Sequence, residues 1–147
     1  MVGDVNATID GCSYLFLSEI QELDFNGLRV VVCEGRPTGE AEPRFVGDSV
    51  IPDCTRIEIT EDSAAFEIIW ENYVAYSVLN ESYAAPDGEE QYEGRRFRVY
   101  SKSRFIDYVA RASFACPEYP GPSQHYGIVC ENHVIDVIST VPPIVLP

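Results

Sequence analysis

Apolar and polar residues alternate along several short stretches of this chain, and the alternation predicts β-strands. Residues 55–60 place Ile57 and Ile59 on one side and polar residues on the other. Residues 95–101 alternate in the same way. Because successive side chains of a strand point to opposite faces, each stretch is expected to bury one face against a core.

Two turn signals predict hairpins. Asn26-Gly27 accepts the positive φ angles of a type I′ turn, and in that register Asp24 lies opposite Arg29. Near the end of the chain, Glu131-Asn132 separates two apolar runs, and Asn tolerates the left-handed conformation that such a turn requires. We therefore expect antiparallel strand pairs at both places.

The stretch from Phe66 to Leu79 is the most apolar part of the chain and contains its only tryptophan. We interpret it as two strands, Phe66–Trp70 and Tyr73–Leu79, that turn at Glu71-Asn72. A single long bent strand is the alternative. Both faces are largely apolar, so these residues are expected near the middle of a sheet.

One helix is predicted, at about residues 103–113. Ser103 is a suitable N-cap, because its hydroxyl can accept a backbone N–H of the first helical turn. The apolar residues that follow recur at helical spacing and form one stripe, which a sheet face is expected to cover. They are Phe105, Tyr108, Val109 and Ala112.

These elements predict an α+β fold: an antiparallel sheet of about six to eight strands with one main helix packed on it. The length of 147 residues suits a single globular domain spanning residues 1–147. Residues 1–11 and 141–147 are expected to be loosely packed termini. Glycines and prolines punctuate residues 34–56, which predicts a long loop with one short strand at Arg44–Val46.

The chain is strongly acidic, with a formal net charge of −14. Such a charge favours solubility, disfavours direct binding to nucleic acids or anionic membranes, and favours a basic protein partner. Acidity that serves solubility alone is the alternative. No stretch is long and apolar enough for a membrane span. No basic and apolar leader opens the chain, which predicts a cytoplasmic protein.

The five cysteines are widely spaced and odd in number, so we expect reduced thiols and no metal site. If Glu131-Asn132 is a two-residue turn, Cys130 and His133 lie opposite each other, which is the one arrangement suggestive of a metal or a nucleophile. Further ligands are missing from the pattern, so a buried thiol beside a hydrogen-bonded histidine is the favoured interpretation. No cofactor motif, phosphate-binding loop or nucleophile elbow is present, so we predict no cofactor, no catalytic residues and a non-enzymatic protein.

An acidic block dominates the middle of the sequence. Residues 58–94 carry ten acidic side chains and no lysine or arginine, and tyrosines are interleaved with them. Carboxylates can receive arginine forks, and tyrosines supply rigid contact area. The alternative is a solvated acidic surface with core tyrosines. The predicted partner-binding residues are Glu67, Glu71, Tyr73, Tyr76, Glu81, Tyr83, Glu89, Glu90, Tyr92 and Glu93.

A basic segment follows the acidic block, since residues 95–111 hold six of the ten basic residues of the chain. Arg96, Arg98, Lys102 and Arg104 are interpreted as neutralising part of the acidic block rather than as a nucleic-acid contact, because the overall negative field would repel nucleic acid.

Three hypotheses for function remain open. The leading one is an immunity or inhibitor protein that neutralises a basic partner such as a toxin or nuclease. The chain resembles such proteins only in being small, acidic and free of a cofactor motif. The second is a DNA-mimic inhibitor of a DNA-binding enzyme, with carboxylates spaced like phosphates. The third is a small enzyme or metal site around Cys130 and His133.

Overall fold

The computed structural model describes residues 2–147, which form two helices and ten strands arranged in two sheets. The two helices are α1 (Val2–Asp10) and α2 (Arg104–Ala112), and short 3-10 turns span Asp24–Asn26 and Glu81–Tyr83. The strands are β1 (Tyr14–Leu23), β2 (Gly27–Val46), β3 (Ser49–Glu58), β4 (Ala65–Trp70), β5 (Tyr73–Asn80), β6 (Gln91–Glu93), β7 (Phe97–Lys102), β8 (Gln124–Val129), β9 (His133–Ser139) and β10 (Ile144–Leu146).

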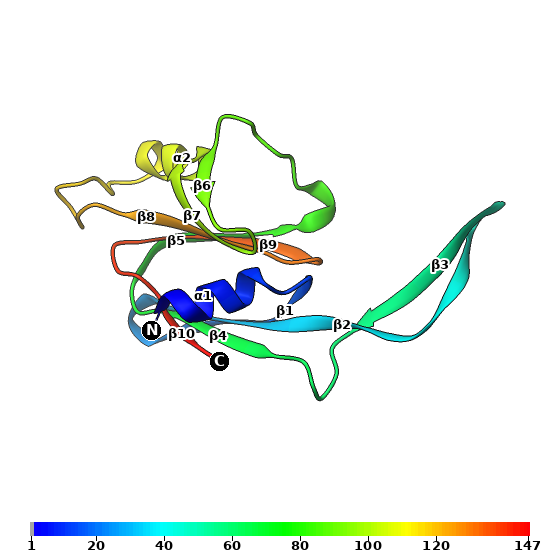
Figure 1. Ribbon diagram of the computed structural model, residues 1–147. Helices are drawn as coiled ribbons and strands as arrows, with labels where there is room; N and C mark the ends of the chain where they lie inside the picture. The colour runs from blue at the N-terminus through cyan, green and yellow to red at the C-terminus, as the bar shows by residue number, and fades with distance from the viewer. Residues whose placement is uncertain (1) are drawn as a thin grey trace.

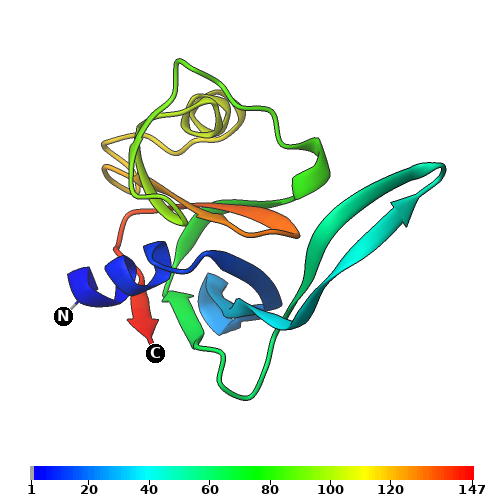
Figure 2. The same ribbon diagram turned by 45° about the vertical axis from the view of Figure 1, so that its right-hand side comes forward.

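The strands are antiparallel and split between two five-stranded sheets. The first has the order β1-β2-β4-β10, with β3 also paired to β2, and the second has the order β5-β9-β8-β7-β6. Figures 1 and 2 show the sheets stacked, with α2 over the outer face of the second. The prediction of a mostly antiparallel fold with few helices is confirmed, whereas the predicted single sheet of six to eight strands with one helix was too simple.

The core lies between the two sheets and follows from the period-2 alternation of their strands. The first sheet contributes the fully buried side chains of Val30 and Val32 in β2 and Ile68 in β4. The second sheet contributes those of Ile135 and Val137 in β9. Burying each of these side chains stabilises the fold by roughly 1.5–3 kcal/mol. The core positions therefore account for the apolar runs of the sequence.

Two predicted hairpins have different outcomes. Strands β8 and β9 pair around Glu131-Asn132, and the Cys130 N–H donates to the His133 carbonyl at 2.9 Å, so this hairpin is confirmed. By contrast, β4 and β5 do not pair with each other, because the chain passes from the first sheet to the second at Glu71-Asn72. A two-residue connection can thus join two layers as well as two neighbouring strands.

The hairpin near Asn26-Gly27 exists, but its predicted register was wrong. Its loop contains three residues, and the closing pair is Leu23 with Gly27. The positive φ angles fall at Phe25 (60°) and Asn26 (59°) rather than at the glycine. In consequence Arg29 does not face Asp24; its guanidinium pairs with Glu19 of β1 at 3.1 Å and with Glu67 of β4.

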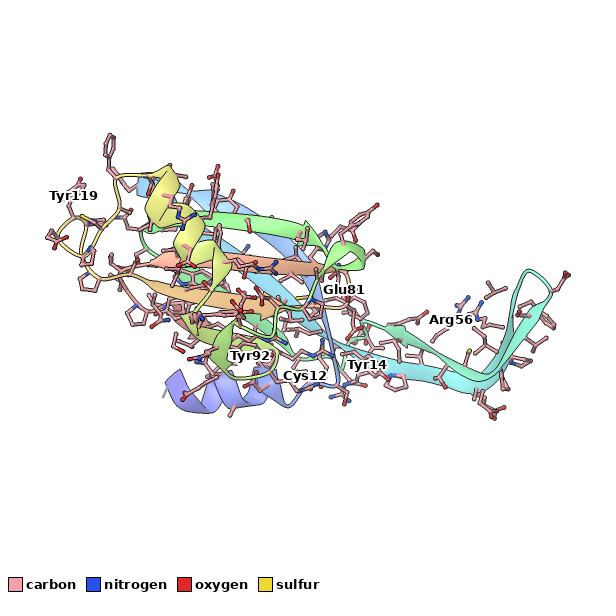
Figure 3. The ribbon with its side chains drawn as sticks, turned by 90° about the horizontal axis from the view of Figure 1, so that it is seen from above. Cys12, Tyr14, Arg56, Glu81, Tyr92 and Tyr119 are labelled. Atoms are coloured by element: carbon pink, nitrogen blue, oxygen red, sulfur yellow. The ribbon has the colours of Figure 1, made fainter. Side chains whose placement is uncertain are left out.

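Residues 34–56 were predicted as a long loop with one short strand at Arg44–Val46, and instead they form most of a projecting β-hairpin. The outer half of β2 pairs with β3 from Arg36–Glu58 to Val46–Ser49, and Gly47 has the positive φ that a tight two-residue turn needs. This hairpin (residues 36–58), called the arm below, projects beyond the other strands of the first sheet and beyond the second sheet, and Arg56 lies on it (Figures 1 and 3). Its prolines are tolerated because each strand of a two-stranded arm has a free edge.

The two termini are better packed than the sequence predicted. Ile9 of α1 is fully buried, and one oxygen of Asp10 accepts backbone N–H groups from Arg95 at 3.1 Å and from Arg96 and Phe97 at 2.8 Å. The carboxylate thereby fixes α1 to the start of β7. At the other end, Ile144–Leu146 pairs with β4 as an edge strand, where flanking prolines do no harm.

Candidate functional site

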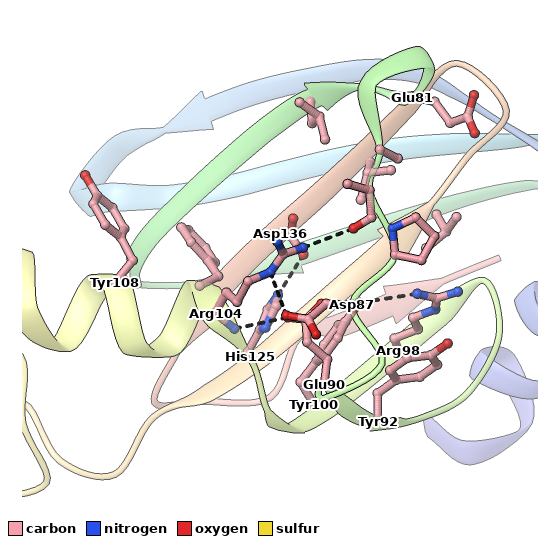
Figure 4. A pocket seen from close by; sticks show the side chains of 17 residues that line it. Glu81, Asp87, Glu90, Tyr92, Arg98, Tyr100, Arg104, Tyr108, His125 and Asp136 are labelled. Atoms are coloured by element: carbon pink, nitrogen blue, oxygen red, sulfur yellow. Dashed lines mark hydrogen bonds and ion pairs between the residues drawn. The ribbon is translucent and has the colours of Figure 1, made fainter.

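A cavity of about 760 Å³ lies on the outer face of the second sheet, between that sheet, α2 and the segment connecting β5 to β6 (Figure 4). Outward-facing residues of β7, β8 and β9 line its floor, while residues 81–90 and the start of α2 line its sides. It is lined by Leu79, Glu81, Ala84, Ala85, Pro86, Asp87, Glu90, Tyr92, Arg98, Tyr100, Arg104, Phe105, Tyr108, His125, Val129, Val134 and Asp136.

A buried hydrogen-bonded chain runs through the floor. His125, which is 2% exposed, contacts Ser103 Oγ through Nδ1 at 2.8 Å and Asp136 Oδ1 through Nε2 at 2.7 Å. Ser103 Oγ also accepts the N–H of Ile106 at 3.1 Å, as a helix N-cap. All partners are satisfied when the Ser103 hydroxyl donates to Nδ1 and the Nε2–H donates to Asp136.

Tyr100 covers this chain from the β7 side. Its ring stacks on His125 with a centroid separation of 4.1 Å, and burial raises the pKa of its phenol. Gly127 leaves room for the stack, because a Cβ at that position would lie 2.8 Å from the Tyr100 ring and 3.4 Å from Asp136 Oδ1. The lack of a side chain at Gly127 therefore lets the phenol and the carboxylate approach each other.

The segment 84–90, called the strap below, is held over the cavity mainly by one residue of α2. The Arg104 guanidinium pairs with Asp87 at 3.2 Å and donates to the Ala85 carbonyl at 3.0 Å. In addition, the Arg104 backbone N–H donates to Glu90 Oε2 at 3.0 Å, so a carboxylate lies at the N-terminus of α2, where the helix dipole favours it. These contacts fix the strap against the helix.

Arg98 lies at the β6 side of the cavity without a carboxylate partner among the described residues. Its guanidinium stacks over the Tyr92 ring at 4.1 Å and donates to the Arg95 carbonyl at 3.0 Å. The cavity thus already contains one guanidinium held by an aromatic ring, in the geometry of a cation–π contact.

The predicted binding residues are only partly brought together. Glu81, Glu90 and Tyr92 line the cavity, and Figure 4 shows Glu81 at its rim. Tyr83 is 75% exposed in the turn after β5. Glu89 and Glu93 are exposed in the strap and in β6. These six residues flank one region of the second sheet.

The other four predicted residues lie elsewhere. Glu67 sits on β4 in the first sheet and is paired with Arg29. Glu71 follows β4, at the opposite end of β5 from Glu81, and eight strand residues span about 27 Å. Tyr73 and Tyr76 pack against the core, and a hydrogen bond to Glu22 at 2.5 Å raises the pKa of Tyr73 to about 12.

Most acids of the 58–94 block form no ion pair with another described residue. Among the described residues, ion pairs join Glu58 to Arg56, Glu67 to Arg29 and Asp87 to Arg104, and the other seven of the ten acids make none. The basic segment after the block neutralises little of it. Arg96 pairs instead with Glu131 at 2.7 Å, outside the block.

Cys130 and His133 flank the two-residue turn and the thiol is buried, both as predicted. Cys130 is 1% exposed, and burial raises its pKa to about 12, so the reactive thiolate is scarce at neutral pH. Nδ1 of His133 is buried without a hydrogen-bond partner among the described residues. Among residues 5–147, whose side chains the structure describes, no three His, Cys, Asp or Glu side chains are grouped as a metal site would require.

The sequence did not reveal that Ser103, His125 and Asp136 form a connected set. Their order matches that of a hydrolase triad, which needs an accessible serine oxygen. Ser103 is 3% exposed, its oxygen caps α2, and it does not line the cavity. The set is therefore arranged to support the floor. The β8–β9 register carries the missed signal, because it places His125 diagonally from Asp136 on one face.

No protein-family model, curated protein or solved structure matches this chain. Neither of the helices in the described residues combines the length and the apolar character needed to cross a bilayer.

Proposed function

We propose that this protein is a non-enzymatic acidic binding protein that holds a basic protein partner through the region around the cavity. The observation that carries the proposal is that seven of the ten acids in residues 58–94 make no ion pair within the described chain, and that four of the seven, Glu81, Glu89, Glu90 and Glu93, lie in or beside the cavity. Carboxylates that the protein's own arginines leave unpaired attract a cationic partner and fix its orientation.

The region offers contact area as well as charge. Tyr83 is 75% exposed and Tyr92 is 43% exposed, and both lie among the unpaired acids Glu81, Glu89 and Glu93. Tyrosine side chains lose little conformational entropy on binding, so they serve as anchors in an otherwise polar surface. An immunity or inhibitor protein that blocks a cationic toxin or nuclease is the most specific version of this function.

The five cysteines support a location in a reducing compartment such as the cytoplasm. All five lie in the described part of the chain, and all have free thiols. Disulfides persist in oxidising compartments and are rare in the cytosol.

Affinity capture with matched charge variants tests the proposed function. The tagged protein is incubated with lysate of the source cells at low and at high salt, and recovered proteins are identified by mass spectrometry. We expect a protein of net positive charge that is released as salt rises, because exposed ion pairs are screened.

The variants then locate the contact. Glu89→Gln with Glu93→Gln should weaken binding of that partner roughly 2- to 30-fold, since each exposed pair contributes about 0.2–1 kcal/mol. Glu40→Gln with Glu42→Gln removes the same charge from the arm and should leave binding nearly unchanged. Recovery of no basic protein, or equal losses in both double variants, would contradict the proposal.

A further inference from the structure

The cavity holds carboxylates that the arginines lining it do not neutralise. Four acids and two arginines line it. Arg104 is engaged by Asp87 and Arg98 by the Tyr92 ring, and neither forms an ion pair with Glu90 or Asp136. The carboxylates of the lining exceed its arginines by two, so the cavity is complementary to a cation.

Two of these carboxylates lie at the two ends of the buried chain in the floor. Asp136 binds His125 Nε2, and Glu90 accepts the N–H of Arg104, the residue after Ser103, whose Oγ contacts His125 Nδ1. Asp136 is fixed by His125 through Oδ1, and its second oxygen accepts no hydrogen bond from the described residues. Glu90 is fixed through Oε2 at the N-terminus of α2, and its other oxygen is likewise unused.

The walls suit a planar cation with an apolar stem. Phe105 and Tyr108 of α2 stack on each other at 6.5 Å, while Leu79 and Val134 add aliphatic surface. A guanidinium stacks on aromatic rings and donates in a fork to carboxylates, whereas its methylene stem packs on apolar surface. An ammonium group is a strongly hydrated point charge and uses these walls less well.

We propose that the cavity receives an arginine side chain of the basic partner, with Asp136 and Glu90 as its carboxylate acceptors and Phe105 and Tyr108 as its aromatic wall. This assignment rests on the proposed function, because it specifies how the same region binds a basic protein. The strap then lies over the bound side chain, and Arg104 holds it in place through Asp87.

Titration of the protein with short blocked peptides, followed by two-dimensional NMR, tests the assignment. The probe is acetyl-Gly-Arg-Gly-amide, and the matched peptides carry citrulline, which has the same shape without the charge, or lysine. We expect saturable shifts at cavity residues with a Kd on the order of millimolar. Compared with the arginine peptide, the citrulline peptide should bind at least about tenfold more weakly and the lysine peptide at least about threefold more weakly.

Conservative variants identify the acceptors. Asp136→Asn and Glu90→Gln each keep an oxygen for the existing hydrogen bond, and each should weaken binding of the arginine peptide roughly three- to tenfold. Glu71→Gln removes the same charge at the far end of β5 and should change binding less than about twofold. Folding of each variant is checked from its own NMR spectrum.

Equal binding of the citrulline or lysine peptide, an equal loss in Glu71→Gln, or saturable cavity shifts with inorganic phosphate in place of the arginine peptide would overturn the assignment. The captured partner separates this failure from failure of the proposed function. If Asp136→Asn and Glu90→Gln leave its affinity unchanged while Glu89→Gln with Glu93→Gln lowers it, the protein is still an acidic binder and the cavity is not its arginine receptor.

Discussion

Replacing Ser103 by alanine tests whether the buried chain in the floor supports the fold. The Ser103 hydroxyl accepts the Ile106 N–H at 3.1 Å and contacts His125 Nδ1 at 2.8 Å. Loss of the cap costs about 1 kcal/mol. A buried nitrogen left without its partner costs about 1–3 kcal/mol more. We therefore expect Ser103→Ala to lower the free energy of unfolding by roughly 2–4 kcal/mol.

Urea denaturation followed by tryptophan fluorescence measures this change, because Trp70 lies in the core. For a chain of this size the same loss lowers Tm by roughly 5–15 °C. Ser101→Ala is the matched control, since Ser101 is exposed and should cost less than about 0.5 kcal/mol.

A double-mutant cycle separates the cap from the histidine contact. When His125→Phe is combined with Ser103→Ala, no ring nitrogen remains that could lose its serine partner. The double variant should therefore lose less free energy of unfolding than the sum of the losses in the two single variants, by roughly 1–2 kcal/mol. Additive costs, or a cost below about 0.5 kcal/mol for Ser103→Ala alone, would refute the account of the floor.

Three further predictions concern reactivity and packing. A thiol reagent at pH 8 should modify the exposed Cys116 rapidly and leave Cys130 unmodified until the protein unfolds; rapid modification of both would contradict the burial of Cys130. The folded-state pKa of Tyr73 is raised to about 12, so the contribution of its hydrogen bond to stability is complete below pH 10 and is lost as pH rises towards 12. Between pH 10 and 12 the free energy of unfolding should therefore fall less in Tyr73→Phe than in the unmodified protein, and an equal fall would count against the hydrogen bond. Gly127→Ala should destabilise the protein by about 1–3 kcal/mol in urea, because its Cβ would lie 2.8 Å from the Tyr100 ring, and an unchanged midpoint would show that the ring moves freely.

Local patterns predicted the local elements of the fold. The N-cap Ser103 and the apolar spacing behind it located α2, and the Glu131-Asn132 turn located the β8–β9 hairpin. Both depend on residues close together in sequence. The split into two sheets depends on whether the strand after Glu71-Asn72 joins the same sheet or the other one. Core packing on both sides decides this, rather than the turn itself.

The arm was missed because the prolines and glycines of residues 34–56 were interpreted as breaking every strand except a short one at Arg44–Val46, which lies in β2. Pro43 falls at a register shift between Glu42 and Arg44, so the pairing continues around it. The Gly47-Asp48 pair, flanked by Val46 and Ser49, was the available hairpin signal. A two-stranded arm tolerates irregularities that the centre of a sheet does not.

Composition alone could not place the predicted partner-binding residues in space. Of the ten residues selected for their chemistry, Glu81, Glu90 and Tyr92 line the cavity. Sequence proximity could not separate them from Glu71 and Tyr73, because β5 carries the chain from one end of the sheet to the other.

Hydrogen exchange of the protein alone and in complex with its captured partner tests the central claim most directly. The claim is that unpaired carboxylates around the cavity bind a basic protein. We expect the partner to slow amide exchange in residues 81–93 and in the first turn of α2, and to leave the arm and the Glu71-Asn72 connection unchanged. Protection confined to the arm, or to the end of the molecule around Glu71, would contradict the claim.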